Sequence, residues 1–352
     1  MEKRFLKRFF IGLGAFLGMI ILIVVIFDPF YHYHGPLGNL KAVLEERDYE
    51  VAGTLDHFDY EAIILGTSIA ENYNTNQFLE NFGMQTIKAI RASGSNADLL
   101  YYLERAYKSQ DVKRVFYFVD YYSLGSPLET TFASADTNYI TNRNPLDDIE
   151  YVLNKDVLLK KIPIQLAYSY VLPYDEGEAY SWYATKEFSQ QAILSRYQPR
   201  EDFLEMESIE KMDEIYYQNI ELLYEKILAH PETEFDIVFS PASALWWDDA
   251  YRGGKAEQYL YLVYYITEKL QACENAKVYF YQAEDVAFEL EQFMDTVHFS
   301  EAVNRDICDK LAEDTGRITI ENAEEKLRMM YDRVEEFATQ GIKEYYPDVT
   351  VR

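Results

Sequence analysis

Five short apolar runs, separated by longer helical stretches, constrain the fold of this chain more than any other feature. Each run is five to seven residues long and contains branched or aromatic side chains, which is typical of buried strands. The predicted strands are Ala62–Gly66, Gln85–Ile90, Arg114–Asp120, Phe235–Pro241 and Lys277–Tyr281. The predicted helices are Asn96–Lys108, Met206–Ala229, Lys255–Cys273 and Ser300–Leu311.

This alternation predicts an α/β fold in which helices cover both faces of a parallel sheet. We expect a flavodoxin-like three-layer sandwich. Its central five-stranded parallel sheet would have the order 2-1-3-4-5 and right-handed crossovers. Ligands bind at the carboxyl edge of such sheets. The residues that follow the strands are therefore the first candidates for function.

The first strand ends in Gly66-Thr67-Ser68, after which the chain turns polar. Gly66 has the conformational freedom for a sharp turn. Ser68 would then expose its hydroxyl and place its N–H near the positive end of a following helix, as a serine nucleophile requires. The alternative is an ordinary strand-to-helix turn in which Ser68 caps the helix.

A serine nucleophile needs a base, and the base needs a carboxylate that fixes its tautomer. Of the five histidines, only His298 combines a late position in the α/β domain with an aspartate, Asp295, three residues before it. That spacing lets the carboxylate reach the imidazole Nδ1. Because Ser68 follows the first strand and the Asp–His pair follows the fifth, all three are expected on one edge of the sheet.

The early Gly-x-Ser and the late Asp-x-x-His together resemble the SGNH (GDSL-like) hydrolase superfamily. More narrowly, the chain looks like the membrane-anchored cell-surface branch, akin to the DltD and alginate-acetylation proteins. The resemblance runs from about Glu61 to Leu311 and also implies the flavodoxin-like strand order. It implies a serine esterase or O-acyltransferase with Ser68 as nucleophile, His298 as base and Asp295 as the orienting carboxylate.

The same resemblance assigns oxyanion donors. A glycine after the second strand donates its N–H in this superfamily, and Gly94 is the matching position. The predicted donors are the amides of Ser68 and Gly94 with the side chain of Asn96. A loop in which Ser95 or Asn96 caps a helix is the alternative. The superfamily's further donor, an Asn after the third strand, is replaced by Asp120, whose ionised carboxylate cannot donate.

Two aromatic features point to a ligand surface. Trp246 and Trp247 follow the fourth strand and would suit stacking on a sugar ring, although a place in the core or in a membrane-facing loop is an equal alternative. The Tyr-rich stretch 136–205 interrupts the alternation. We interpret it as an insertion that caps the site and sets substrate choice.

Four basic residues, Lys3, Arg4, Lys7 and Arg8, precede an uncharged apolar run over residues 9–27. Such a helix spans about 28 Å, close to the hydrocarbon core of a bilayer. No small-x-small cleavage site follows, so we predict an uncleaved signal anchor, single-pass, with the N-terminus in the cytoplasm and the C-terminal domain outside.

His32 and His34, on one side of an extended segment, could bind a metal with Asp28. No third strong ligand is visible, and we predict neither a metal site nor a cofactor. The net charge of −27 excludes nucleic acid as a partner. Cys273 and Cys308 have no metal or redox spacing; one disulfide and two buried thiols both remain open.

The sequence thus predicts an extracytoplasmic enzyme that modifies a cell-envelope polysaccharide or teichoic acid through an acyl-serine. The expected partners are that polymer, the bilayer and a multi-pass membrane acyltransferase. The alternative is a catalytically inactive, membrane-anchored surface protein that binds glycan or the acyltransferase. The predicted segments are a cytoplasmic tail 1–8, a signal anchor 9–27, a juxtamembrane stalk 28–60, an SGNH-like domain 61–315 with the insertion at about 136–205, and a helical tail 316–352.

Overall fold

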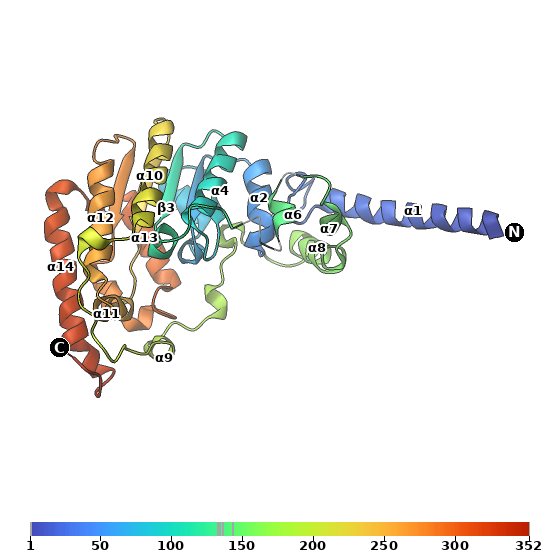
Figure 1. Ribbon diagram of the computed structural model, residues 1–352. Coiled ribbons are helices and arrows are strands. Elements are labelled where there is room, and N and C mark those ends of the chain that lie inside the picture. Colours follow the sequence, from blue (N-terminus) through green and yellow to red (C-terminus); the bar gives the residue numbers. More distant parts are fainter. Residues whose placement is uncertain (1, 132–134, 136, 143, 352) are drawn as a thin grey trace.

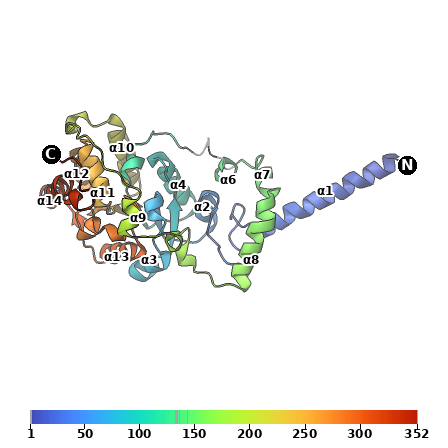
Figure 2. The ribbon, with the colours of Figure 1, turned by 90° about the horizontal axis from the view of Figure 1, so that it is seen from below.

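The computed structural model describes residues 2–131, 135, 137–142 and 144–351 (Figure 1). Met1, Asp136 and Arg352, at which predicted segments begin or end, lie outside the described residues. In the described chain, helices cover both faces of one central sheet, and a single long helix projects from the domain (Figures 1 and 2). The α/β fold class predicted from the alternation is therefore confirmed.

The sheet has six strands in the order β2-β1-β3-β4-β5-β6. They are β1 (Ala62–Gly66), β2 (Thr86–Ile90), β3 (Arg114–Phe118), β4 (Glu234–Phe239), β5 (Ala276–Phe280) and β6 (Arg317–Ile318). The first five are parallel. Gly66 pairs with Ile90 on one side and with Phe118 on the other. Three strand ends therefore meet beside the segment that follows β1.

The prediction of a five-stranded, wholly parallel sheet is wrong in strand count, because β6 extends the sheet and pairs with β5 antiparallel. β6 is two residues long, too short to show a strand period in sequence. It follows a turn in which Gly316 has a φ of 77°. A Cβ at Gly316 would lie 2.3 Å from the Tyr281 ring, so both the conformation and the close approach require glycine there.

Alternate residues of β1 enter different cores, which explains its unbroken apolar pattern: Ile63 and Leu65 face one, Ala62 and Ile64 the other. The larger core is shared by α2 (Arg47–His57), α4 (Asn96–Ser109), α10 (Glu214–Ala229), α12 (Ala256–Leu270) and α14 (Ile320–Thr339). The smaller core contains α3 (Thr75–Phe82) and α13 (Glu301–Ala312), and α11 (Ala244–Arg252) contributes to both.

The predicted helices are recovered, with one shifted start. α10 begins at Glu214 rather than Met206, since a separate short turn at Ile209–Lys211 precedes it. The two cysteines, Cys273 and Cys308, are both buried and free. Of the two possibilities that the sequence left open, the structure has two buried thiols.

The projecting helix α1 (Glu2–Phe27) is long and apolar enough to cross a membrane by length and composition, a test that a signal sequence near the N-terminus also passes (Figures 1 and 2). The residue after α1, Asp28, is almost fully buried and has a φ of 37°. The Asp28 carboxylate accepts hydrogen bonds from the N–H groups of His32, Tyr33 and His34.

The histidines considered as metal ligands have other contacts. Nε2 of His32 lies 3.0 Å from the Asp148 carboxylate, and Nε2 of His34 lies 2.7 Å from the carbonyl oxygen of Val25 at the end of α1. Among the described residues, no group of three or more His, Cys, Asp and Glu side chains is placed to hold a metal ion.

The predicted insertion divides into two parts. Its first half carries α6 (Asn138–Thr141), α7 (Ile149–Val152), the π-helical turn Val157–Lys161 and α8 (Ile162–Tyr170). Figures 1 and 2 show α7 and α8 at the base of α1. Its second half returns to the sheet: the Tyr180 N–H bonds the Leu44 carbonyl, and α9 (Gln190–Leu194) contacts the segment after β5.

Candidate active site

Ser68, His298 and Asp295 lie in hydrogen-bond contact at the carboxyl edge of the sheet. Nε2 of His298 lies 2.9 Å from Oγ of Ser68. Nδ1 of His298 lies 2.9 Å and 2.8 Å from the two carboxylate oxygens of Asp295. Two segments 230 residues apart are thus brought together with the imidazole between hydroxyl and carboxylate. In this arrangement the Nδ1–H donates to Asp295, and Nε2 can accept the proton of the Ser68 hydroxyl.

The loop that carries Asp295 and His298 is fixed from both ends. A β-bridge between Phe293 and Phe299 closes it. Its Thr296 carbonyl accepts hydrogen bonds from both the N–H and the hydroxyl of Ser243, just before α11. The imidazole therefore sits on a short, closed loop, which limits the positions it can adopt.

The electrostatics of Asp295 favour its ionised form. Burial by itself raises the pKa of this carboxyl, but the hydrogen bond from His298, the charge of His298 and the backbone N–H groups of Val297 and His298 outweigh burial and lower the pKa. An ionised Asp295 can hold the Nδ1–H tautomer and stabilise the imidazolium.

Ser68 begins a three-residue 3-10 turn, Ser68–Ala70, where we expected the start of a helix. The next α-helix, α3, begins at Thr75 after the Asn74 cap. The role expected for Gly66 also needs correction. Its backbone does not adopt a positive φ; a Cβ there would lie 2.8 Å from the Ala70 Cβ, so glycine is needed for close packing under the turn.

Two of the three predicted oxyanion donors have other hydrogen-bond partners. Asn96 is fully buried; its amide donates to Asn219, and its oxygen accepts the Tyr117 hydroxyl. The prediction for Asn96 is therefore wrong, because this side chain joins β3 to α10. The Gly94 N–H donates to the Arg91 carbonyl at 3.0 Å within a turn. The Ser68 amide, at the start of its turn, remains the candidate donor.

Asp120, at the position where an asparagine was expected, fixes the nucleophile segment. One carboxylate oxygen accepts the Thr67 hydroxyl at 2.7 Å, and the other accepts the Tyr122 N–H at 2.9 Å. Asp120 thereby caps α5 (Tyr121–Leu124) and holds the residue before Ser68. It supplies acceptors where an oxyanion would need donors.

A cavity of about 560 Å³ opens beside Ser68 and His298. The aromatic residues that line it are Tyr121, Tyr122, Tyr216, Trp246 and Tyr259. The Tyr121 and Trp246 rings stack at 5.2 Å with an interplanar angle of 18°. Trp246 thus lines the cavity, and its contact with a substrate stays a prediction. The one for Trp247 is wrong: it is fully buried and donates its Nε1–H to Gln282.

The insertion contributes a residue that sequence reasoning missed. The Trp182 ring lies edge-on to the His298 imidazole at 5.2 Å and 83°. The Trp182 N–H bonds the Asn72 side chain, and its side chain hydrogen-bonds the Glu71 carboxylate. Only its place in the insertion and its aromatic character could have drawn attention to Trp182, since the contact spans more than a hundred residues.

Lys88 joins the insertion to the nucleophile segment. It is buried in β2, and its ammonium donates to the carbonyl oxygens of Glu71 and Ala179. Burial lowers the pKa of Lys88 to about 7, against the opposing charges of Glu178 and Glu71. Burial also raises the pKa of Glu71, with Arg47, Trp182 and Lys88 opposing it. The wall next to His298 is therefore a buried polar network.

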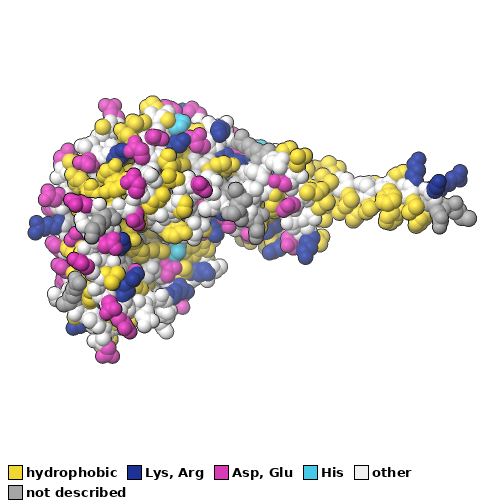
Figure 3. Space-filling view, viewed as in Figure 1, with side chains coloured by type: hydrophobic (Ala, Val, Ile, Leu, Met, Phe, Trp, Pro, Cys, Tyr) yellow, Lys and Arg dark blue, Asp and Glu magenta, His cyan; other side chains and the backbone are white. Residues whose placement is uncertain are grey.

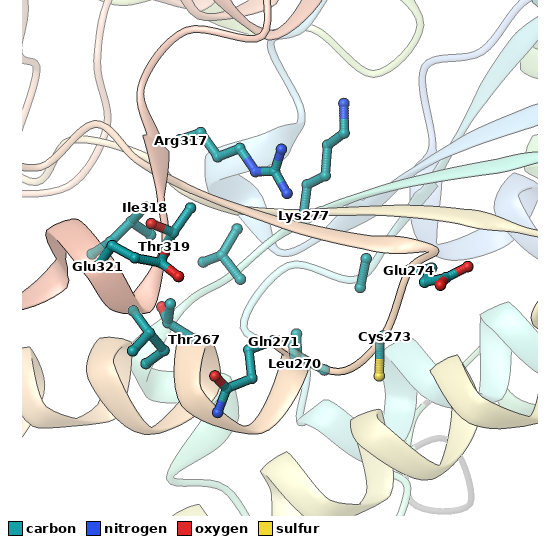
Figure 4. Close-up of a pocket in the computed structure, with 13 residues that line it drawn as sticks. Thr267, Leu270, Gln271, Cys273, Glu274, Lys277, Arg317, Ile318, Thr319 and Glu321 are labelled. Carbon is teal, nitrogen blue, oxygen red and sulfur yellow. The ribbon is translucent and has the colours of Figure 1, made fainter.

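A second cavity, of about 310 Å³, lies between the end of α12, the amino ends of β5 and α14, and β6 (Figure 4). It is lined by residues such as Cys273, Lys277 and Arg317, with no serine or histidine among its lining residues. Because it sits at the amino end of β5, it is separate from the edge that carries Ser68. We therefore take the aromatic cavity as the candidate active site.

Comparisons with known proteins are sparse. No protein-family model matches the chain, and no curated protein matches it. Among solved structures, the chain is similar to one described as a "putative platelet activating factor" from Streptococcus pneumoniae, with 11% identity and a TM-score of 0.40 over 76% of this chain and 89% of the other. A similarity this weak establishes neither fold nor activity.

Proposed function

We propose that the protein is a membrane-anchored serine esterase or O-acyltransferase that acts on a cell-envelope polysaccharide or teichoic acid. The observation that carries the proposal is the continuous contact from Ser68 through His298 to Asp295 beside an open cavity. The sequence resemblance to the SGNH superfamily and its cell-surface branch supports the same chemistry.

In the first half-reaction, Oγ of Ser68 attacks the carbonyl carbon of an ester while Nε2 of His298 takes the hydroxyl proton. Asp295 stabilises the resulting imidazolium. The tetrahedral intermediate collapses, the ester C–O bond breaks, and the leaving alkoxide receives the proton from Nε2. The product of this half-reaction is an acyl-Ser68 and a free alcohol.

In the second half-reaction, water or a glycan hydroxyl attacks the acyl-Ser68 carbonyl, and His298 accepts the proton of the attacking group. Collapse releases Ser68, which regains its proton from the imidazolium. Water gives a free acid, and a hydroxyl gives a new ester. The stacked rings of Tyr121 and Trp246 offer a surface for a sugar ring or an acyl chain at this step.

The location follows from the N-terminal helix. We infer that α1 is an uncleaved anchor whose basic end stays in the cytoplasm, which places the acidic domain outside. A multi-pass membrane acyltransferase is the expected supplier of the acyl group if the reaction is a transfer.

The second candidate is a catalytically inactive surface protein that binds glycan or such an acyltransferase. Three observations favour it: Asp120 stands where a donor is expected, Asn96 lies in the core, and the Gly94 N–H is used in a turn. The aromatic cavity would then serve for binding alone.

A fluorophosphonate probe distinguishes the two candidates on full-length protein in detergent. We expect wild type to be labelled and Ser68→Ala to be unlabelled. Ser93→Ala is the matched control, because Ser93 is an exposed serine that lines the same cavity, and this variant should keep the label. Labelling that survives Ser68→Ala would contradict the enzyme proposal. An unlabelled wild type that still binds glycan would support the second candidate.

A further inference from the structure

Exposed apolar side chains outside α1 concentrate in residues 146–172, which include α7 and α8 and which we call the collar. Six large apolar residues of the collar are between 48% and 85% exposed: Leu146, Ile149, Leu159, Tyr170, Val171 and Leu172. Soluble surfaces rarely gather so many apolar side chains without a partner or a membrane. The collar therefore needs something to cover it.

The collar packs around the end of α1. Val24 is fully buried, and it shares a small core with Tyr151, Val152 and Ile162 of the collar. Ile21, Ile23, Val25 and Phe27 are partly buried against the same core. Figure 3 shows hydrophobic surface along α1 that continues onto the neck of the domain, where Figure 1 places α7 and α8.

Helix geometry gives the length of α1 that packs against the collar. Ile21 to Phe27 corresponds to a rise of about 9 Å at 1.5 Å per residue. If the apolar run up to Phe27 fills the hydrocarbon core of the bilayer, Phe27 lies at the boundary of that core. The collar then surrounds the two turns of α1 that lie just inside this boundary. Interfacial helices bury their apolar faces about 5–10 Å deep, which is the same range.

The collar is held rigidly to α1. The Tyr151 hydroxyl donates to the Asp28 carboxylate at 2.7 Å. The Phe30 ring stacks between Tyr49 of α2 and Tyr151 of α7, at 5.0 Å and 5.5 Å. Helix, collar and domain are thus joined through buried contacts at Asp28 and Phe30. The apolar face of the collar keeps a set orientation toward the segment that would enter the bilayer.

The α8 half of the collar, residues 157–172, is less acidic than the rest of the chain. This half contains Lys160 and Lys161 and no carboxylate, in a chain whose net charge is −27, whereas residues 146–156 contain Lys155 together with Asp147, Asp148, Glu150 and Asp156. Lys161 is paired with Glu46, and Lys160 is exposed. A lysine beside an apolar helix face can extend its ammonium to the headgroups while its stem stays among apolar groups.

We propose that the collar lies in the interface of the bilayer that α1 crosses, and that it sets the orientation of the candidate active site relative to the membrane. This inference rests on the proposed membrane insertion of α1. The occupant of the apolar face is lipid. Its hydrocarbon chains contact the six exposed apolar side chains of the collar, and its headgroups contact Lys160.

The test uses the full-length protein in phospholipid vesicles whose acyl chains are brominated, with an environment-sensitive fluorophore at single introduced cysteines. The collar positions are Leu159→Cys and Val171→Cys, 72% and 79% exposed. The matched controls are Leu228→Cys and Met329→Cys, apolar residues of the domain that are 54% and 53% exposed. Leu17→Cys reports on α1 itself. Unsubstituted protein gives the background labelling of the two buried cysteines.

We expect quenching by brominated lipid at both collar positions to exceed quenching at the two controls by roughly threefold or more. Quenching at Leu17→Cys with none at the collar would overturn the proposal and leave the anchor intact. Absence of quenching at all five positions would overturn both the collar proposal and the proposed insertion of α1 into the membrane. Collar labels that are shielded from aqueous iodide but unquenched by lipid would assign this face to a protein, against the proposal.

Discussion

The candidate active site has two parts. One, the complete side, is the hydrogen-bonded contact of Ser68, His298 and Asp295. The other, the incomplete side, is the region where donors to an oxyanion are expected. On the side of His298, every group of the Ser68–His298–Asp295 contact has a partner, and a closed loop and the insertion hold the imidazole. Around the expected oxyanion position, Asp120 supplies an acceptor, the Asn96 side chain and the Gly94 N–H are used elsewhere, and the Ser68 amide remains the candidate donor. If Ser68 is the proposed nucleophile, its activation and the stabilisation of an oxyanion depend on different residues, and substitutions should change the two separately.

The largest expected effect tests the complete side. Asp295→Asn removes the carboxylate that fixes the imidazole tautomer, and we expect acyl-transfer or probe-labelling rates to fall by about 10⁴-fold. The rate of fluorophosphonate labelling measures this. Asp111→Asn, at an aspartate that is 77% exposed, is the control and should label at the wild-type rate. A wild-type rate for Asp295→Asn would mean that the contact seen here does not activate Ser68.

The next effect tests the incomplete side. Asp120→Asn keeps an oxygen that can accept the Tyr122 N–H and adds an amide donor near Ser68. Single oxyanion donors contribute about 10²–10³-fold, so we expect a rise in labelling rate of about 10-fold or more. A loss as large as that for Asp295→Asn would show instead that the Asp120 carboxylate is needed to hold Thr67. Asp120 would then be required on the complete side as well, and the two sides could not be changed separately.

The smallest expected effect concerns the network that braces the complete side. Because the folded-state pKa of Lys88 is lowered to about 7 from its usual 10.5, the unfolded chain binds more protons in the window between these values. Below about pH 7, Lys88 is charged in both states, and burial of that charge lowers the free energy of unfolding by its full amount. This penalty is lost as the pH rises from about 7 to 10.5. Wild type should therefore gain thermal stability relative to Lys88→Met as the pH rises from about 7 to 10.5. A pH-independent difference between the two unfolding temperatures would contradict the lowered pKa.

The sequence was sufficient for the α/β fold class and for the contact of Ser68 and Asp295 with His298. Short apolar runs separated by helical stretches identified β1 to β5, and the rule that parallel strands end at one edge predicted that Ser68 lies near His298. Both inferences use local patterns plus a topology that has few alternatives. The two-residue β6 has no such pattern and was missed.

The residues around the reacting groups could not be predicted in the same way. Asn96 begins α4 and Trp247 lies within α11, and only the packing shows that they bond Asn219 and Gln282 in the core. Trp182 reaches His298 from an irregular insertion through contacts that are distant in sequence. Side-chain direction at a loop depends on tertiary contacts, which a single sequence does not specify.

The central claim is that Ser68 is an activated nucleophile. It is tested most directly by intact-protein mass spectrometry of the full-length chain after treatment with a fluorophosphonate, followed by peptide mapping of the adduct. The account predicts one adduct, on Ser68, which is absent in Ser68→Ala and which forms far more slowly in Asp295→Asn. An adduct on any other serine, or a Ser68 adduct that forms equally fast without Asp295, would contradict it.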